Sequence, residues 1–334
     1  MTLPPTPSRA LSRRSFGAAA ASLLLAASLA PAPAQAQNTI IMGKGGWLFP
    51  GWESLTTLDK PGIDRVVGLI GDTKAALAGR NIALVIALVP LKASAYVDKL
   101  PDGVRIAPEV QGQYDYILGQ LRQAGIDTVD LRAALKSVET GKQTAFYRAD
   151  YHWTSWAAEA AADAVGQTIK QKFPRLGGQP GTGDKLGQWV TQRNLGDLAQ
   201  RFLTPEQQRQ VGPDLYTVRA AAQSGGGLLG SGPAPVHVVG NSFVQPYLGF
   251  PQKLSSVIDR PVSLTWQPGN VGPWATFLQF LAAPDFQRAP PQVVVWQFNE
   301  GPFHSGPESP DQWDTASLMS PQTWRERMQQ GVRR

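Results

Sequence analysis

Residues 82–89 read IALVIALV, an unbroken apolar run that ends at Pro90. Eight residues are too few to cross a bilayer, whereas a strand buried on both faces of a sheet is apolar along its whole length. Shorter runs with the same character follow at 236–239, 262–266 and 293–298. The sequence therefore predicts a largely parallel sheet in which most strands are covered on both sides.

Helical patterns alternate with these runs. Apolar residues recur with helical spacing from Val66 to Leu77 and from Tyr114 to Leu121, and Thr154 or Ser155 is placed to cap an Ala-rich helix that reaches about Phe173. A further helix is expected around 273–281 and a short strand at 128–131, whereas residues 174–235 are less regular. This alternation predicts one α/β domain with three α/β/α layers and a mostly parallel sheet.

The N-terminus has the pattern of a bacterial export signal. Arg13-Arg14 precedes an apolar run from Gly17 to Ala30, and Ala34-Gln35-Ala36 supplies small residues for cleavage. Removing residues 1–36 would take away three arginines and no acid, which lowers the formal charge from +6 to +3. We therefore expect a periplasmic protein with a twin-arginine-type signal at 1–36, an uncleaved anchor being the alternative, and no stable transmembrane helix after cleavage.

Composition excludes several kinds of chemistry. The 334 residues include no Cys and only three His, so disulfides, thiol nucleophiles and Cys-ligated metals are absent. No block of Lys and Arg suggests nucleic-acid binding. We predict no cofactor and no metal site, because Asp150 and His152 lack a third ligand in any recognised metal motif. The domain is expected to span 37–304, with a surface tail or wrap at 305–334.

Polar residues follow two of the predicted elements where ligands of parallel sheets usually bind. Gly240-Asn241-Ser242 comes directly after a strand and would place a serine hydroxyl on a tight turn. If residues 147–154 are extended, Asp150 and His152 project to the same side, so that the acid could orient the imidazole toward a serine. His237 lies within a predicted buried strand and His304 in a Pro/Gly loop, which leaves His152 as the one histidine with an acid at suitable spacing.

Four short blocks of the chain form a set: GKGGWLF at 43–49, PLKASAY at 90–96, DYHWT at 150–154 and GNSF at 240–243. Together they resemble the alginate O-acetyltransferase family. The blocks occur in the family's order over about residues 40–300. The resemblance implies an SGNH-hydrolase-like fold in which the Asp-His pair precedes the serine in sequence.

The resemblance also implies residue roles and partners. Ser242 would be the nucleophile, His152 the general base and Asp150 its orienter, acting on an alginate-like exopolysaccharide. A membrane-bound O-acyltransferase would deliver the acetyl group, because an exported enzyme has no access to cytoplasmic acetyl-CoA. The backbone N–H of Ser242 is a natural oxyanion donor, and either Asn241 or Asn299 would add a second.

Substrate contacts are less clearly indicated. Lys92 and Tyr96 are expected to line the cleft, and of the tryptophans near strand ends Trp153 alone is expected to stack on a sugar, because it adjoins His152. Two alternative functions remain open at this point: a secreted carbohydrate acetylesterase with the same triad, and a non-catalytic polysaccharide-binding or assembly protein.

Overall fold

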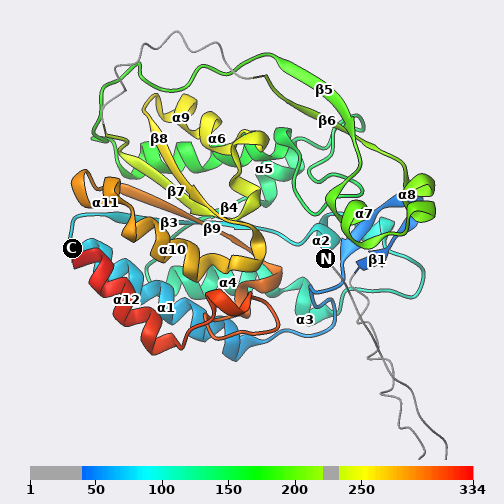
Figure 1. The fold of residues 1–334 in the computed structure, drawn as a ribbon, viewed down its shortest axis with the longest axis horizontal. Helices are drawn as coiled ribbons and strands as arrows, with labels where there is room; N and C mark the ends of the chain where they lie inside the picture. The colour runs from blue at the N-terminus through cyan, green and yellow to red at the C-terminus, as the bar shows by residue number, and fades with distance from the viewer. Residues whose placement is uncertain (1–39, 221–232, 334) are drawn as a thin grey trace, which may run out of the picture. The chain divides into compact units, whose positions relative to one another are not determined.

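The computed structural model describes residues 40–220 and 233–333, so the expected export signal at 1–36 lies outside the described residues. A five-stranded sheet with the order β4-β3-β9-β7-β8 forms the centre of the domain, and every neighbouring pair is parallel (Figure 1). The strands are β3 (Ala83–Val89), β4 (Asp127–Asp130), β7 (Val236–Gly240), β8 (Val262–Trp266) and β9 (Val293–Asn299). All of them are predicted from the sequence to within two residues.

Helices cover both faces of this sheet, which gives the expected three layers (Figure 1). Alternate residues of β3 and β9 point to opposite faces, so that Val85 and Val295 join one core while Ile86 and Trp296 join the other. The first core is covered by α5 (Arg132–Ser137), α6 (Ser155–Lys172) and α9 (Phe250–Ile258). The second is covered by α1 (Lys60–Ala78), α4 (Gln113–Gln123), α10 (Gly272–Ala282), α11 (Pro284–Arg288) and α12 (Pro321–Arg333).

Two antiparallel strand pairs lie outside the central sheet. One pairs β1 (Ile40–Met42) with β2 (Leu48–Pro50), and the other pairs β5 (Trp189–Asn194) with β6 (Asp214–Arg219). Between β5 and β6 the chain forms α7 (Asp197–Phe202) and α8 (Pro205–Val211); two single-turn helices, α2 (Lys92–Ala95) and α3 (Pro108–Gln111), follow β3. The region that looks irregular in sequence thus builds a small structure beside the carboxyl end of the sheet.

The C-terminal segment differs from the expected surface tail. Trp324 and Met328 of α12 are completely buried in the second core, and the indole N–H of Trp324 donates to the carbonyl of Trp274 at 3.1 Å. Apolar residues recur at 324, 328 and 332 with helical spacing. The many polar and basic residues between them make this pattern hard to recognise in the sequence. Residues 321–333 therefore form part of the core of the domain.

None of the helices in the described ranges is both long enough and apolar enough to cross a membrane.

Candidate active site

The turn after β7 presents Ser242 at the carboxyl end of the sheet. Gly240 ends the strand, and Ser242 begins a single 3₁₀ turn that runs to Val244. A Cβ atom on Gly240 would lie 2.7 Å from the side-chain oxygen of Gln297 and 2.8 Å from Val244. A side chain at 240 would force these two groups to shift, so close packing and not a positive φ favours glycine at this position.

The loop before α6 carries the acid and the imidazole. It is not extended but bends between Phe146 and Trp153, which form an isolated antiparallel bridge. Asp150 Oδ1 accepts the backbone N–H of His152 at 2.9 Å and also lies 2.7 Å from His152 Nδ1. A local Asx-type turn therefore brings the two side chains together, rather than the alternation of a strand.

Ser242, His152 and Asp150 form one hydrogen-bonded chain. His152 Nε2 lies 2.7 Å from Ser242 Oγ, and Nδ1 on the other side of the ring faces Asp150. Asp150 and His152 are buried and Ser242 is half-buried, and both Ser242 and His152 line a cleft of about 550 Å³. The arrangement can transfer the serine proton to the imidazole while the carboxylate keeps the ring in one tautomer.

Two residues that the sequence analysis did not single out complete the surroundings of Asp150. Its Oδ2 accepts the backbone N–H of Asp197 at 3.2 Å and the hydroxyl of Tyr216. Burial alone would raise the pKa of Asp150, but its hydrogen bonds with His152 and Tyr216 and the imidazole charge outweigh burial and lower it. Asp150 is therefore held as a carboxylate.

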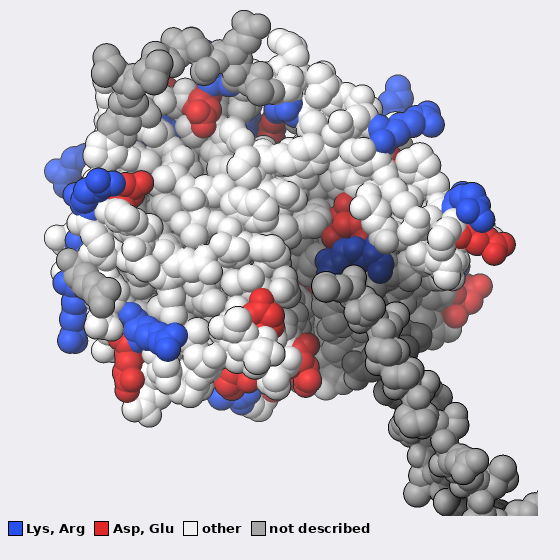
Figure 2. All heavy atoms as spheres, viewed as in Figure 1, with Lys and Arg blue, Asp and Glu red and all other residues white. Residues whose placement is uncertain are grey.

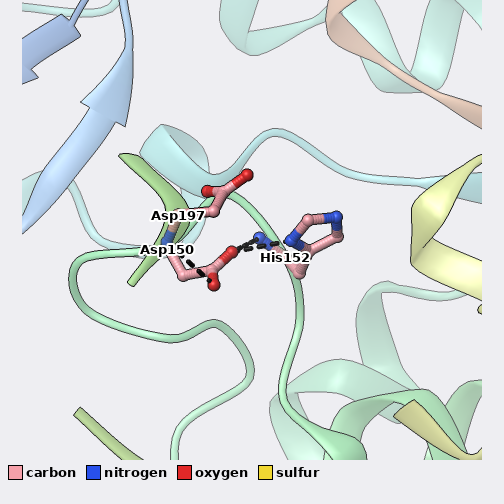
Figure 3. A group of neighbouring side chains, drawn as sticks. All are labelled: Asp150, His152 and Asp197. Carbon is pink, nitrogen blue, oxygen red and sulfur yellow. Dashed lines mark hydrogen bonds and ion pairs between the residues drawn. The ribbon is translucent and has the colours of Figure 1, made fainter. Parts of the chain in front are cut away.

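The side chains of Asp150, His152 and Asp197 also lie close enough to offer three ligand atoms within 4.8 Å of one another (Figure 3). Each is already engaged: Asp150 in the bonds just given, His152 Nδ1 with Asp150, and Asp197 Oδ1 with the backbone N–H of Tyr151 at 3.1 Å. Burial, followed by the charge of Asp150, raises the pKa of Asp197 to about 6. We interpret the group as a hydrogen-bonded charge cluster around the histidine.

The two asparagines expected at the oxyanion position both line the cleft and contact each other. Asn241 Nδ2 donates to Asn299 Oδ1 at 2.9 Å, and Asn299 Nδ2 donates to the hydroxyl of Tyr151 at 3.1 Å. The backbone N–H of Asn241 is occupied by Gln297. Ser242 begins its 3₁₀ turn, and an N–H at that position has no acceptor within the helix.

The expected substrate contacts are corrected by the structure, because Lys92, Tyr96 and Trp153 are buried away from the cleft. The Lys92 ammonium donates to the carbonyls of Leu48, Arg148 and Asp150 at 2.6 to 2.9 Å, and burial lowers its pKa to about 7. These three side chains support the loop that carries the histidine instead of contacting a ligand.

Tyr96 and Trp153 hold the two ends of that loop. The hydroxyl of Tyr96 accepts the backbone N–H groups of Ala145 and Phe146 at 2.8 and 3.2 Å. The indole N–H of Trp153 donates to the carbonyl of Phe243 at 2.8 Å, which ties the histidine loop to the serine turn. The tryptophans that do line the cleft are Trp52, Trp266 and Trp313.

The protonation of His152 predicts how activity depends on pH. Burial alone would lower its pKa, but the hydrogen bond and charge of Asp150 outweigh burial, so the pKa is raised above the ordinary 6.5. A general base must be neutral, so the rate of serine acylation should be full above the raised pKa and fall as pH drops through it. The measurement is kcat/KM for p-nitrophenyl acetate against pH; a midpoint below 6.5 would contradict the assignment.

Comparisons with known proteins identify the family of the chain. A family described as "SGNH hydrolase-like domain, acetyltransferase AlgX" matches residues 40–300. The "Probable alginate O-acetylase AlgJ" of Pseudomonas syringae pv. tomato is 29% identical over 273 residues, which cover 78% of this chain and 68% of that protein. The "Alginate biosynthesis protein AlgX" of Pseudomonas putida is 26% identical over 276 residues, which cover 78% of this chain and 56% of that protein.

A solved structure gives the same result for the fold. The structure titled "O-Acetyltransferase Domain of Pseudomonas putida AlgJ" superimposes with a TM-score of 0.68 and 25% identity, over 87% of this chain and 98% of that one. The expected fold class is confirmed.

Proposed function

Because the chain belongs to the family of AlgX-type SGNH hydrolase-like acetyltransferase domains, we propose that it is a polysaccharide O-acetyltransferase acting through an acetyl-enzyme on Ser242. The observation that carries the proposal is the unbroken chain of 2.7 Å contacts from Ser242 Oγ through His152 to Asp150, with Ser242 and His152 in the lining of a cleft. The relatives are named for alginate, so the acceptor is proposed to be an exopolysaccharide.

The first half-reaction acylates the serine. His152 Nε2 takes the proton of Ser242 as Oγ forms a bond to the acetyl carbon of the donor. The bond from that carbon to the leaving group then breaks, and the leaving group receives the proton from His152. The N–H of Ser242 and the amide of Asn241 or Asn299 are proposed to stabilise the negative oxygen that develops.

The second half-reaction moves the acetyl group to a sugar. A sugar hydroxyl gives its proton to His152 and forms a bond to the acetyl carbon, after which the bond to Ser242 Oγ breaks and Oγ regains the proton. We propose that this takes place in the periplasm after removal of residues 1–36. The acetyl group would come from a membrane-bound O-acyltransferase that works with this protein.

The test separates transfer from hydrolysis. With p-nitrophenyl acetate as donor, we expect a burst of p-nitrophenol equal to the enzyme concentration and an acetyl group on the peptide that contains Ser242, seen by mass spectrometry. Oligosaccharides added afterwards should carry the acetyl group away. Release of free acetate at a rate that no oligosaccharide changes would instead indicate an esterase, and the absence of any burst would indicate a binding protein.

A further inference from the structure

The lining of the cleft carries little positive charge. The Asp, Glu, Lys and Arg side chains that line it are Asp197, Arg201 and Asp311, so Arg201 is the one Lys or Arg among the described residues of the lining. Its guanidinium lies 4.0 Å from the carboxylate of Asp197 and 5.3 Å from the ring centre of Phe202. Lys and Arg are concentrated toward the edges of the face in Figure 2, whose middle is mostly uncharged.

This charge distribution does not fit a polymer with a carboxylate on every sugar. Proteins hold carboxylates with Arg or Lys, preferably through two parallel hydrogen bonds from a guanidinium. Arg201 already faces Asp197, and Asp311 adds a second negative charge without a matching cation in the lining. A polyuronate would therefore be repelled by two acids and gain at most one cationic contact.

Aromatic side chains make up another part of the lining. Trp52 is 37% exposed, and its indole is fixed by Tyr151 and Phe202, whose ring centres lie 5.5 and 5.8 Å from its own. Trp266 is half-buried at the end of β8, beside Gly240 in the sheet. A rigid indole face offers apolar area to the C–H groups of a sugar ring at a low cost in side-chain entropy.

Uncharged amides supply most of the remaining polar groups. An amide donates and accepts hydrogen bonds at once, which matches the dual character of a sugar hydroxyl. The amides that line the cleft are Asn241, Gln245, Asn270, Gln297, Asn299 and Gln312. Gln297 and Asn299 are buried and bond to each other, so the amides with exposed surface toward a ligand are those of Gln245, Asn270 and Gln312, beside the rings of Trp52 and Trp266.

From this lining we propose that the acceptor in the cleft is an uncharged glycan, stacked on Trp52 and Trp266, and not a polyuronate. The proposal rests on the proposed function and narrows its substrate. It predicts that binding of the neutral glycan depends on aromatic faces and amides, and hardly on salt concentration.

Binding to the Ser242→Ala protein tests the substrate class without requiring catalysis. Calorimetry would compare neutral hexasaccharides of glucose, mannose and galactose with hexamannuronate. We expect the best neutral hexasaccharide to bind at least about tenfold more tightly than hexamannuronate. Equal or tighter binding of hexamannuronate, or no binding by any neutral chain, would overturn the proposal.

Two tryptophan variants test where the glycan lies. Trp52→Ala should weaken binding of the best neutral hexasaccharide about tenfold. Trp156→Ala is the control, because Trp156 is partly exposed but packs against Trp189 outside the cleft, and it should leave the affinity unchanged. Equal losses in both variants would contradict stacking on Trp52.

A gain-of-function variant checks the role of charge. Gln312→Lys places a cation in the lining and should improve hexamannuronate binding severalfold at low salt, with the gain lost at high salt. An unchanged affinity for hexamannuronate would count against the charge argument. The p-nitrophenol burst of the wild-type protein is measured in parallel. Absence of the burst would contradict the proposed acetyl-enzyme, whereas a burst together with tighter binding of hexamannuronate would contradict only the proposed acceptor class.

Discussion

Ser242→Ala is expected to abolish the burst of p-nitrophenol and to lower acetyl transfer by about 10⁴-fold or more. The serine Oγ forms the bond to the acetyl carbon, so no other group can replace it in the first half-reaction. The domain should stay folded, since Ser242 is only half-buried and its Oγ contributes one hydrogen bond, to His152. Stopped-flow absorbance measures the burst, and thermal unfolding checks the fold.

A second serine–histidine pair in the same sheet provides the control. His237 Nδ1 lies 2.7 Å from Ser263 Oγ, the same separation as at the proposed catalytic pair, but its other nitrogen faces Thr265 instead of a carboxylate. Burial lowers the pKa of His237 to about 3, so this imidazole stays neutral. Ser263→Ala should therefore keep the burst. A burst retained in Ser242→Ala would reject the nucleophile assignment.

The inner strands β3, β7 and β9 could be predicted because burial on both faces of a sheet requires an apolar run, and few other structures of that length need one. The positions of Ser242, Asp150 and His152 follow from short local patterns next to those elements. The way in which these three side chains come together could not be predicted from the sequence. The Asp-His pair meets through a bend, and glycine at 240 is explained by the packing of Gln297, which is distant in sequence.

The residues that sequence reasoning missed act over long separations. Asp197 and Tyr216 reach Asp150 from 47 and 66 residues further along the chain. They come from α7 and β6, part of a region whose partly exposed, polar residues give no clear periodicity. Proximity in sequence also misleads: Trp153 follows His152, yet its indole points into the core.

Asp150→Asn is expected to lower kcat by about 10³–10⁴-fold at neutral pH, although the side chain keeps its size. The reason lies in the donors around Oδ2, where the Tyr216 hydroxyl and the Asp197 N–H both require an acceptor. Oδ1 accepts one backbone N–H, that of His152, whereas Oδ2 accepts a backbone N–H and the Tyr216 hydroxyl. We therefore expect the amide oxygen to take the Oδ2 position, which turns the NH₂ group toward His152 Nδ1 at the cost of the bond to the His152 N–H. The proton then moves to Nε2, which faces Ser242 and can no longer accept the serine proton.

Nitrogen NMR of the imidazole measures this change of tautomer directly, alongside the rate of serine acylation. Tyr216→Phe in the Asp150→Asn background removes one of the two donors that fix the amide, so part of the lost rate should return. Asp163→Asn, in an ion pair with Lys253 on the surface, controls for loss of a carboxylate and should leave the rate unchanged. A wrong tautomer that is held in place stops proton transfer from the serine. If the acylation rate of Asp150→Asn stayed within about tenfold of the wild-type rate, catalysis would therefore not need Asp150 to orient His152.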